Sequence, residues 1–138
     1  MLKLQILTQE ETVSEEEVDS VTIPTAAGEI TVLPGHTTLF SKLDLGQLIM
    51  RKGGKEEMLA VHGGFVDIGP SWVKVMADTA IRAADINELK AKEAIAAAEK
   101  AMQEKDKGQD FLEAQMSLQR ALLELNTIKK WKKRAMQG

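Results

Sequence analysis

The chain has 138 residues and a hydrophobic content of 43%, which is enough to build a packed core and excludes a disordered chain. It contains no cysteine, which excludes disulfides, thiolate zinc sites and a cysteine nucleophile. No run of about eighteen apolar residues is present, so we expect a soluble chain that faces the cytoplasm, without membrane insertion.

The net charge of −3 is unevenly distributed along the chain. Residues 1–85 hold 7 basic and 13 acidic side chains, a balance of −6, and residues 86–138 hold 11 and 8, a balance of +3. A basic C-terminal half could meet nucleic acid, an anionic membrane surface or an acidic protein. Aromatic residues make up only 4% of the chain, which disfavours stacking on bases. We therefore expect an acidic protein surface as the partner and no nucleic acid.

The first 84 residues carry the signals of a small antiparallel β-domain. All 3 prolines and 8 of the 10 glycines lie there, between short apolar runs. Lys52-Gly53-Gly54-Lys55 and Gly69-Pro70-Ser71 predict hairpin turns. We predict a compact sandwich or flattened barrel, with strands at Leu2–Leu7, Val18–Pro24, Glu29–Leu33, Gln47–Met50, Met58–Val61, Phe65–Ile68 and Trp72–Met76.

Residues 85–138 are dominated by alanine, leucine, lysine and glutamate, which are strong helix formers. Asp85 to Glu88 and Asp110 to Glu113 each have the form of a capping box, which predicts a helix start at each aspartate. Lys105 to Gln109, which includes a glycine, predicts the turn between the helices. The predicted fold class is therefore α+β, a β-sandwich domain over residues 1–84 followed by a hairpin of two antiparallel helices over residues 85–138.

The second predicted helix carries one apolar seam at a spacing of three or four residues: Phe111, Ala114, Leu118, Leu122, Leu125 and Ile128. The first helix offers mostly small apolar side chains as its partner, at Leu89, Ala94, Ile95, Ala97, Ala98, Ala101 and Met102. A two-helix hairpin buries little area, so we expect it to be marginally stable and able to dock elsewhere.

Two segments of the first domain form an unusual pair of motifs. Gly28-Glu29-Ile30-Thr31-Val32-Leu33-Pro34-Gly35-His36 places two tight turns around a short strand, and Val61-His62-Gly63-Gly64-Phe65-Val66 follows downstream. Together they resemble the epsilon subunit of F-type ATP synthases, which typically carries a G-E-L-G-I-L-P-G-H run and then a V-x-G-G-F run. Asp78 to Arg82 likewise matches the A-D-T-A-x-R connection of that family. The resemblance spans essentially the whole chain.

The resemblance implies a non-catalytic rotor subunit in the central stalk of a proton-translocating F-type ATP synthase. Such a subunit would be a peripheral membrane protein at the cytoplasmic face of the cell membrane. Its implied partners are the gamma subunit, the c-ring, and the catalytic beta and alpha subunits. It would couple gamma to the c-ring and inhibit ATP hydrolysis through its helices. Glu29, Ile30 and His36 would contact the c-ring, although an exposed turn also commonly carries a solvated charge. The Gly63–Gly64 doublet would be a packing feature at or beside the gamma interface.

The last turns of the second helix are strongly basic, with Lys129, Lys130, Trp131, Lys132, Lys133 and Arg134 in succession. Cations at this position complement a helix dipole, which is one sufficient explanation for them. The resemblance implies a second one, in which these residues contact an acidic segment of the beta subunit and stop rotation. Charge complementarity and the Trp131 anchor would support that contact.

Some bacterial relatives bind ATP in the hairpin through an I/L-D-x-x-R-A motif, which here is altered. Asn87 replaces the aspartate, and Lys90 replaces the arginine and its bidentate fork. Arg120 matches a family arginine, but Glu124 stands where ATP-binding relatives tend to have another, and its carboxylate would repel phosphate. Lys90 and Arg120 remain the candidate nucleotide contacts. We expect ATP to bind weakly or not at all, and no other cofactor.

The chain shows no pattern of catalytic or metal-binding residues. His36 and His62 are the only histidines, and neither belongs to an H-x-x-x-H or H-E-x-x-H motif. No serine lies in a nucleophile-base signature, which disfavours a hydrolase. A stand-alone β-sandwich adaptor that binds a partner protein through its helical hairpin remains an alternative.

Overall fold

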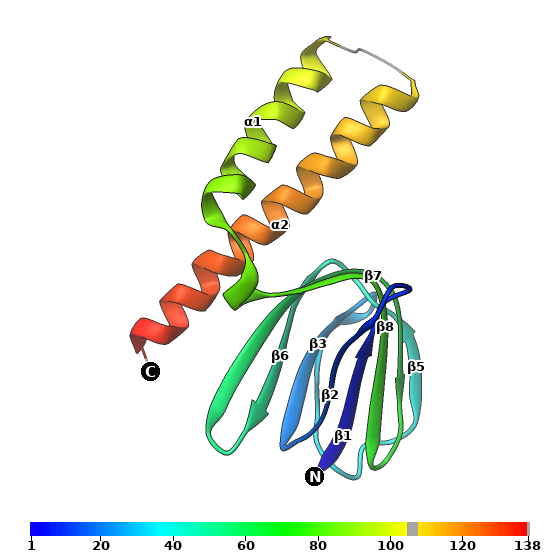
Figure 1. Cartoon of the computed structure of the whole chain (residues 1–138). Helices are drawn as coiled ribbons and strands as arrows, with labels where there is room; N and C mark the ends of the chain where they lie inside the picture. The colour runs from blue at the N-terminus through cyan, green and yellow to red at the C-terminus, as the bar shows by residue number, and fades with distance from the viewer. Residues whose placement is uncertain (105–107, 138) are drawn as a thin grey trace. The chain divides into compact units, whose positions relative to one another are not determined.

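The computed structural model describes residues 1–104 and 108–137, in which eight strands are followed by two long helices in contact (Figure 1). The predicted α+β class, a β-sandwich followed by two helices, is confirmed. The strands are β1 (Leu2–Leu7), β2 (Thr12–Val18), β3 (Ser20–Thr25), β4 (Gly28–Val32), β5 (Leu39–Lys42), β6 (Gly46–Lys52), β7 (Lys55–Ile68) and β8 (Trp72–Arg82). A short 3₁₀ turn, η1 (Ala83–Asp85), leads to α1 (Glu88–Glu104) and α2 (Gln109–Gln137).

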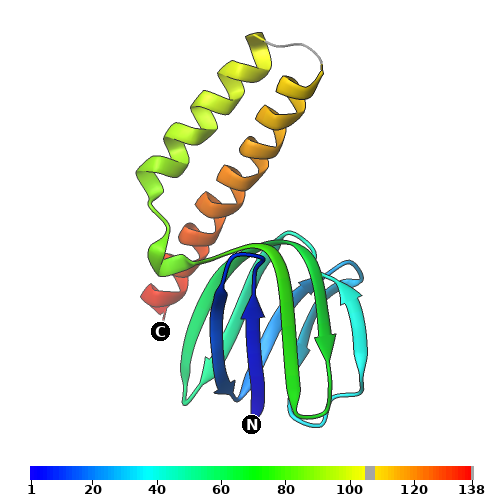
Figure 2. The same ribbon diagram turned by 45° about the vertical axis from the view of Figure 1, so that its right-hand side comes forward.

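The strands form two layers because β7 and β8 each take part in both (Figures 1 and 2). The first half of β7 pairs with β6 and its second half pairs with β5. The first half of β8 pairs with β1, and β8 pairs with β7 along most of its length. One layer therefore runs β2-β1-β8-β7-β5 and the other runs β4-β3-β6-β7-β8. All strand pairs are antiparallel except β1 with β8, which is parallel.

The bend that carries β7 from one layer to the other lies at Gly63 and Gly64. Their φ angles are +72° and +104°, which residues with a Cβ rarely adopt. A Cβ at Gly64 would also collide with the carbonyl oxygen of Met76 on β8, so only glycine permits the close approach of the two strands.

The core lies between the two layers and is almost entirely aliphatic. Alternate residues of each strand point inward, as in Leu2, Leu4 and Ile6 of β1. The buried cluster comprises Leu2, Leu4, Ile6, Val18, Val21, Ile23, Val32, Leu43, Leu48, Met50, Leu59, Val61, Val66, Ile68, Val73, Val75 and Ala77.

The sequence pattern missed two strands, β2 and β5. It also predicted two separate strands where the structure has the single strand β7. The strand β2 contains the run Glu15 to Glu17, which hides the alternation of apolar and polar residues. Ser14 and Val18 are nevertheless buried. The glutamates are tolerated because β2 lies at the edge of the sheet. The strand β5 has only four residues and follows directly from a turn segment. The predicted strands on either side of Gly63–Gly64 form the single bent strand β7.

The first helix starts later than predicted, and Asn87 rather than Asp85 caps it. Residues Ala83–Asp85 form η1, and the amide of Ile86 donates to the carbonyl of Ala83 at 3.1 Å. The Oδ1 atom of Asn87 then accepts a hydrogen bond from the amide of Lys90 at 3.0 Å. The second helix begins at Gln109, where the amide of Leu112 donates to the carbonyl of Gly108 at 3.1 Å. Of the predicted turn Lys105–Gln109, residues 105–107 lie outside the described residues, and Gln109 belongs to α2.

The predicted apolar seam of α2 is wrong at Leu122 only: Ala114 and Ile128 are buried, and Phe111, Leu118 and Leu125 are half-buried. Ala121 is 2% exposed, whereas Leu122 is 42% exposed and points away from the buried stripe. On α1 the predicted contact residue Leu89 is 66% exposed, and Ala91 and Ala98 are the buried positions. Small side chains therefore supply much of the buried surface in the helical part of the chain.

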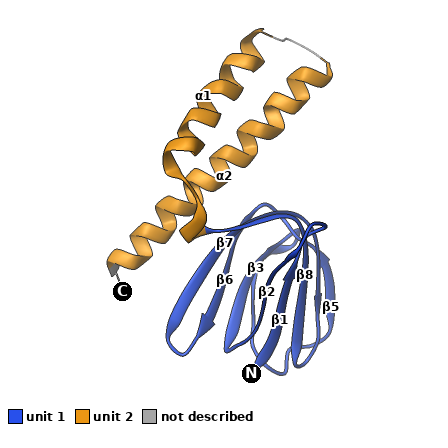
Figure 3. Ribbon diagram, in the orientation of Figure 1, with its two compact units in different colours: residues 1–82 blue, residues 83–138 orange. Residues whose placement is uncertain are grey.

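The chain divides into two compact units, Met1–Arg82 and Ala83–Gly138 (Figure 3). Arg82, the last residue of the first unit, is tied into the sandwich. Its Nη2 atom donates to the carbonyl oxygen of Val13 at 3.0 Å, and its guanidinium pairs with the carboxylate of Glu57. The end of β8 is thereby fixed to a strand of each layer.

Gly64→Ala should destabilise the sandwich by about 2–4 kcal/mol. The alanine would have to keep a positive φ, and its Cβ would collide with the backbone of β8. Gly53→Ala is the matched control, since Gly53 has φ +58° and open space around its Cβ position. We expect the control to cost about 1 kcal/mol. Urea unfolding followed by tryptophan fluorescence measures both. Equal losses for the two variants would mean that close approach at Gly64 contributes nothing.

Candidate interaction surfaces

An apolar surface lies on the outer side of the layer that contains β1, β8, β7 and β5. Residues that alternate with the core point outward there, and the pairing register sets Leu7 beside Met76 and Met76 beside Phe65. Phe65 also stacks on Phe40, with ring centroids 5.5 Å apart and an interplanar angle of 18°. Both rings are largely exposed, at 43% and 62%. We call Leu7, Met76, Phe65 and Phe40 the aromatic face.

The structure does not bring Glu29 and His36 together. Glu29 lies near the start of β4 and is exposed, while His36 lies beyond the other end of that strand. The turn that leads into β4 adjoins the end of β5, where the amide of Ala26 donates to the carbonyl of Lys42 at 3.1 Å. At the opposite end the amide of Gly35 donates to the carbonyl of Pro70 at 2.7 Å. Glu29 and His36 therefore lie at opposite ends of β4 and do not form one compact contact site.

Ile30 and the two histidines are less available than Glu29. Ile30 is half-buried and packs against the core cluster. His36 is half-buried and its Nδ1 atom lies 2.6 Å from the carbonyl oxygen of Thr37. His62 is half-buried on β7, in register with Thr79 of β8. Of the three predicted c-ring contacts, Glu29 alone is fully exposed.

The two candidate nucleotide contacts lie at different levels of the helical unit. Glu88 of α1 pairs with Lys132 of α2 at 3.4 Å, so the start of one helix lies beside the end of the other. Lys90 is then level with the residues that precede Lys132, whereas Arg120 lies about 15 Å further along α2 at 1.5 Å per residue. Both side chains are exposed, and the described hairpin does not bring them together.

Arg120 has a carboxylate as its electrostatic neighbour. Burial raises the pKa of Glu124, and the positive charge of Arg120 partly opposes that shift. When Glu124 is ionised, its negative charge weakens the attraction of Arg120 for a phosphate group.

The basic end of α2 is mainly exposed, and Lys132 in it is paired with a residue of α1. Lys132 donates to Glu88, which also pairs with Lys92 at 3.9 Å. Trp131 is half-buried, so part of its ring is unavailable to a partner. The six residues 129–134 all lie inside α2, where cations near the carboxyl end also complement the helix dipole.

The sequence patterns missed the aromatic face. Phe40 lies in the strand β5, which was not predicted, so its stacking on Phe65 was hidden. The segment Leu39 to Lys42 has only four residues and no alternation of apolar and polar residues, so it carried no clear strand signal.

Residues 1–104 and 108–137 contain neither a metal-binding cluster nor a membrane-spanning helix. No group of three or more histidine, aspartate or glutamate side chains is arranged to hold a metal ion in this part of the chain. None of the helices described is both long and apolar enough to cross a membrane.

Two family models together match most of the chain. Residues 1–83 match the family described as "ATP synthase, Delta/Epsilon chain, beta-sandwich domain". Residues 84–129 match "ATP synthase, Delta/Epsilon chain, long alpha-helix domain".

Curated relatives agree with these matches over nearly their full length. The ATP synthase epsilon chain of Herpetosiphon aurantiacus is 38% identical over 128 residues, which cover 93% of this chain and 94% of the relative. The epsilon chain of Dehalococcoides mccartyi is 41% identical over 133 residues, covering 96% and 95%. That of Herminiimonas arsenicoxydans is 35% identical over 131 residues, covering 94% of each chain.

Two solved structures of ATP synthases contain chains that are similar to this one. A chain in the cryo-EM structure of the Euglena gracilis mitochondrial ATP synthase has a TM-score of 0.74 at 26% identity, covering 86% of this chain and 75% of that one. A chain in the central stalk and c-ring of the Tetrahymena thermophila mitochondrial ATP synthase has a TM-score of 0.53 at 11% identity, covering 62% and 69%. This second similarity concerns the fold alone.

Glu124→Gln should stabilise the helical unit at neutral pH, because the ionised form of Glu124 is the one that burial penalises. The pKa of Glu124 is higher in the folded state than in the unfolded chain, where it is about 4.3. The wild type therefore regains stability as the pH falls and Glu124 becomes protonated in the folded state. The difference in melting temperature between variant and wild type should therefore be largest at neutral pH and vanish near pH ~4. Circular dichroism melting measures it, with exposed Glu113→Gln as the control. A difference that grows as the pH falls would contradict the direction of the shift.

Proposed function

The chain belongs to the ATP synthase delta/epsilon chain family, as a non-catalytic subunit of the central stalk, and from this premise we propose that it couples the gamma subunit to the c-ring and restrains ATP hydrolysis. The observation that carries the proposal is the division of the chain into a sandwich unit and a separate helical unit with a cationic end. The first unit would join rotor parts, and the second would regulate. We place it peripherally, on the cytoplasmic face of the membrane that holds the complex.

The aromatic face supports docking of the gamma subunit on the outer side of β7 and β5. Phe40 and Phe65 expose a stacked pair of rings on a rigid sheet, and large aromatic side chains commonly dominate binding energy at interfaces. An apolar cluster of this kind is usually covered by a partner.

For the c-ring contact we propose Glu29, Ile30 and His36, with Glu29 as the main contact. Glu29 is exposed on β4, an edge strand that pairs only with β3 on one side. Its neighbour Ile30 is half-buried against the core, so only the exposed part of its side chain would touch the partner. His36, at the opposite end, would contribute only if the partner surface extends along β4.

For the regulatory role we propose that Lys129, Lys130, Trp131, Lys132, Lys133 and Arg134 contact an acidic surface of the catalytic beta and alpha subunits. Five cations within six residues complement such a surface and would speed its docking. The pairing of Lys132 with Glu88 would then be exchanged for pairing with the partner. No role is proposed for a bound nucleotide, since Lys90 and Arg120 lie apart.

Replacing the five cations of residues 129–134 by glutamine should raise the rate of ATP hydrolysis of the assembled enzyme several-fold, because the contact that stops rotation loses its attraction. Deleting residues 110–138 should have the same effect, although it removes nearly all of α2. Lys100→Gln, an exposed lysine of α1, is the control and should leave the rate unchanged. A hydrolysis rate that is the same in both tail variants as in the wild type would remove the inhibitory role.

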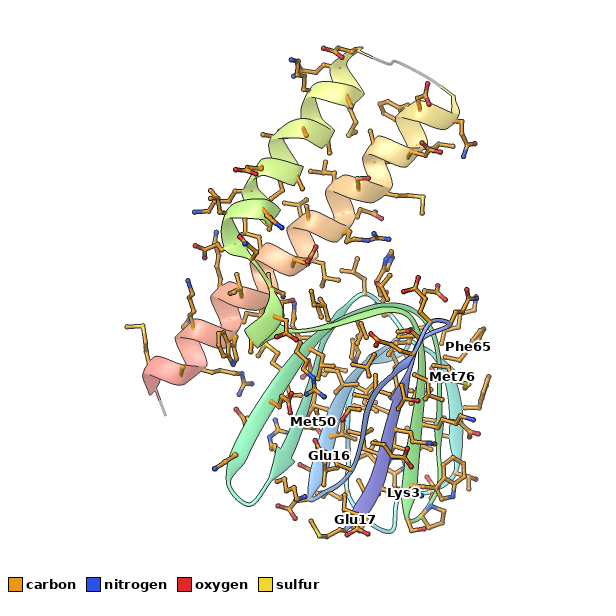
Figure 4. All side chains as sticks on the ribbon, viewed as in Figure 1. Lys3, Glu16, Glu17, Met50, Phe65 and Met76 are labelled. Carbon is orange, nitrogen blue, oxygen red and sulfur yellow. The ribbon has the colours of Figure 1, made fainter. Side chains whose placement is uncertain are left out.

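Glu29→Lys should lower ATP-driven proton pumping relative to hydrolysis, because it reverses the charge at the proposed c-ring contact. Pumping is measured by fluorescence quenching in membrane vesicles that carry the complex. Glu17→Lys, at an exposed glutamate of β2, is the control (Figure 4). If His36→Ala lowers pumping and Glu29→Lys does not, the contact lies at the His36 end instead.

A further inference from the structure

Two threonines face each other on the outer side of the layer that contains β7, β6, β3 and β4. Thr22 of β3 lies between Val21 and Ile23, which both belong to the core cluster, so its side chain points to the outer side of the layer. Thr31 of β4 is directly opposite Thr22 in the strand register and therefore shares that side. Thr22 is 3% exposed, whereas Thr31, on the edge strand, is exposed.

Three hydrogen bonds connect these threonines to the neighbouring strands. The Nε atom of Arg51 donates to Oε2 of Glu56 at 2.9 Å, which joins β6 to β7. The Nη1 atom of Arg51 donates to Oγ1 of Thr22 at 2.9 Å, which joins β6 to β3. The Oγ1 atoms of Thr22 and Thr31 lie 2.9 Å apart, which joins β3 to β4. We call the side chains of Glu56, Arg51, Thr22 and Thr31 the polar row.

The direction of the last hydrogen bond follows from the other two. A guanidinium group can only donate, so the hydroxyl of Thr22 accepts from Arg51. A buried hydroxyl hydrogen needs an acceptor, and among the described residues Thr31 is the one that Thr22 has. Thr22 therefore donates to Thr31. The hydroxyl hydrogen of Thr31 is left over, on a residue that faces solvent.

The free donor of Thr31 lies next to the exposed carboxylate of Glu29. The two residues are two positions apart in β4, so they share one side of the strand at a spacing of about 7 Å. An ionised Glu29 can only accept hydrogen bonds, whereas the polar row leaves Thr31 a hydrogen to donate. The positive charge at the start of the row polarises the bonds that follow it, which makes Thr31 a better donor than an isolated threonine.

We propose that Thr31 is a second contact residue beside Glu29, whose hydroxyl donates to an oxygen atom of the c-ring, and that Arg51 positions this donor through Thr22. This inference rests on the proposed contact between Glu29 and the c-ring. Thr31 stands where the typical run of the family, G-E-L-G-I-L-P-G-H, has its second glycine. The donor is therefore a feature of this chain and not of the typical motif.

The test measures the concentration of purified subunit that half restores ATP-driven proton pumping in membrane vesicles from which this subunit has been removed. Thr31→Val keeps the shape of the side chain without its hydroxyl, so this concentration should rise about three- to tenfold, as expected for one hydrogen bond. Thr31→Ser keeps the hydroxyl and should stay within a factor of about two. Thr12→Val, at an exposed threonine of the other edge strand, is the control and should change nothing.

A double variant separates the contact from the stability of the fold. Thr31→Val alone leaves the buried hydroxyl of Thr22 without its acceptor, which lowers stability. Thr22→Val combined with Thr31→Val removes both hydroxyls, and the freed N–H group of Arg51 can reach water because that side chain is 33% exposed. All variants are assayed well below their melting temperatures, so that a loss of stability alone leaves restoration unchanged. Restoration by the double variant at the wild-type concentration would overturn the inference.

Arg51→Lys tests the positioning role, because lysine keeps the charge but lacks the planar fork that bonds Glu56 and Thr22 together. It should raise the half-restoring concentration in the same direction as Thr31→Val. Combined with Thr31→Val it should add nothing, since Arg51 acts through the hydroxyl that is already missing. Additive effects of the two substitutions would show that Arg51 acts by another route, which contradicts its proposed role.

Glu29→Lys distinguishes a failure of this inference from a failure of the proposed function. If Glu29→Lys raises the half-restoring concentration and the Thr31 variants do not, Thr31 makes no contact while the c-ring contact of Glu29 stands. If none of these variants raises it, the proposed c-ring contact at β4 fails as well.

Discussion

The bend of β7 and β8 at Gly63–Gly64 is the constraint on which the sandwich depends. A strand of fourteen residues would otherwise be too long for one layer of this domain, and the bend lets it serve both. The two layers then enclose the core from opposite sides, and β5 finds its place against the second half of β7. The positive φ angles and the approach of β8 at Met76 both require glycine, so fold and surface are set at the same point.

The helical unit is held by weaker interactions. Its buried positions on α1 are alanines, and the pair between Glu88 and Lys132 is largely exposed, where such pairs contribute no more than about 1 kcal/mol. A small buried area and exposed charge pairs give a low free energy of local opening. The sandwich has an aliphatic core and an end fixed by Arg82, so a change in the helices need not disturb it.

The sequence predicts an element more reliably when its apolar periodicity extends over more residues. The long helices and the strands with clear alternation were predictable, because many residues repeat the same period. The strand β2 was hidden by Glu15 to Glu17, whose charges are acceptable only because the strand lies at an edge, a tertiary fact. The cap at Asn87 was missed because Asp85 offered a second good capping pattern, and the η1 turn decides between them. The Phe40–Phe65 pair depends on register between β5 and β7, which no local pattern specifies.

The run from Gly28 to His36 shows why a motif that identifies a family need not form one binding surface. Gly28 and Gly35 have φ angles of +117° and +89°, so they serve the turns at the two ends of β4. The amide of Gly35 bonds to Pro70 and ties its turn to the β7–β8 connection, which is a structural role. Ile30 packs against the core, and Glu29 alone presents a fully exposed charge between the turns. Most of the motif therefore specifies the fold of the edge strand, and the part left for recognition is the outer row of side chains that begins at Glu29.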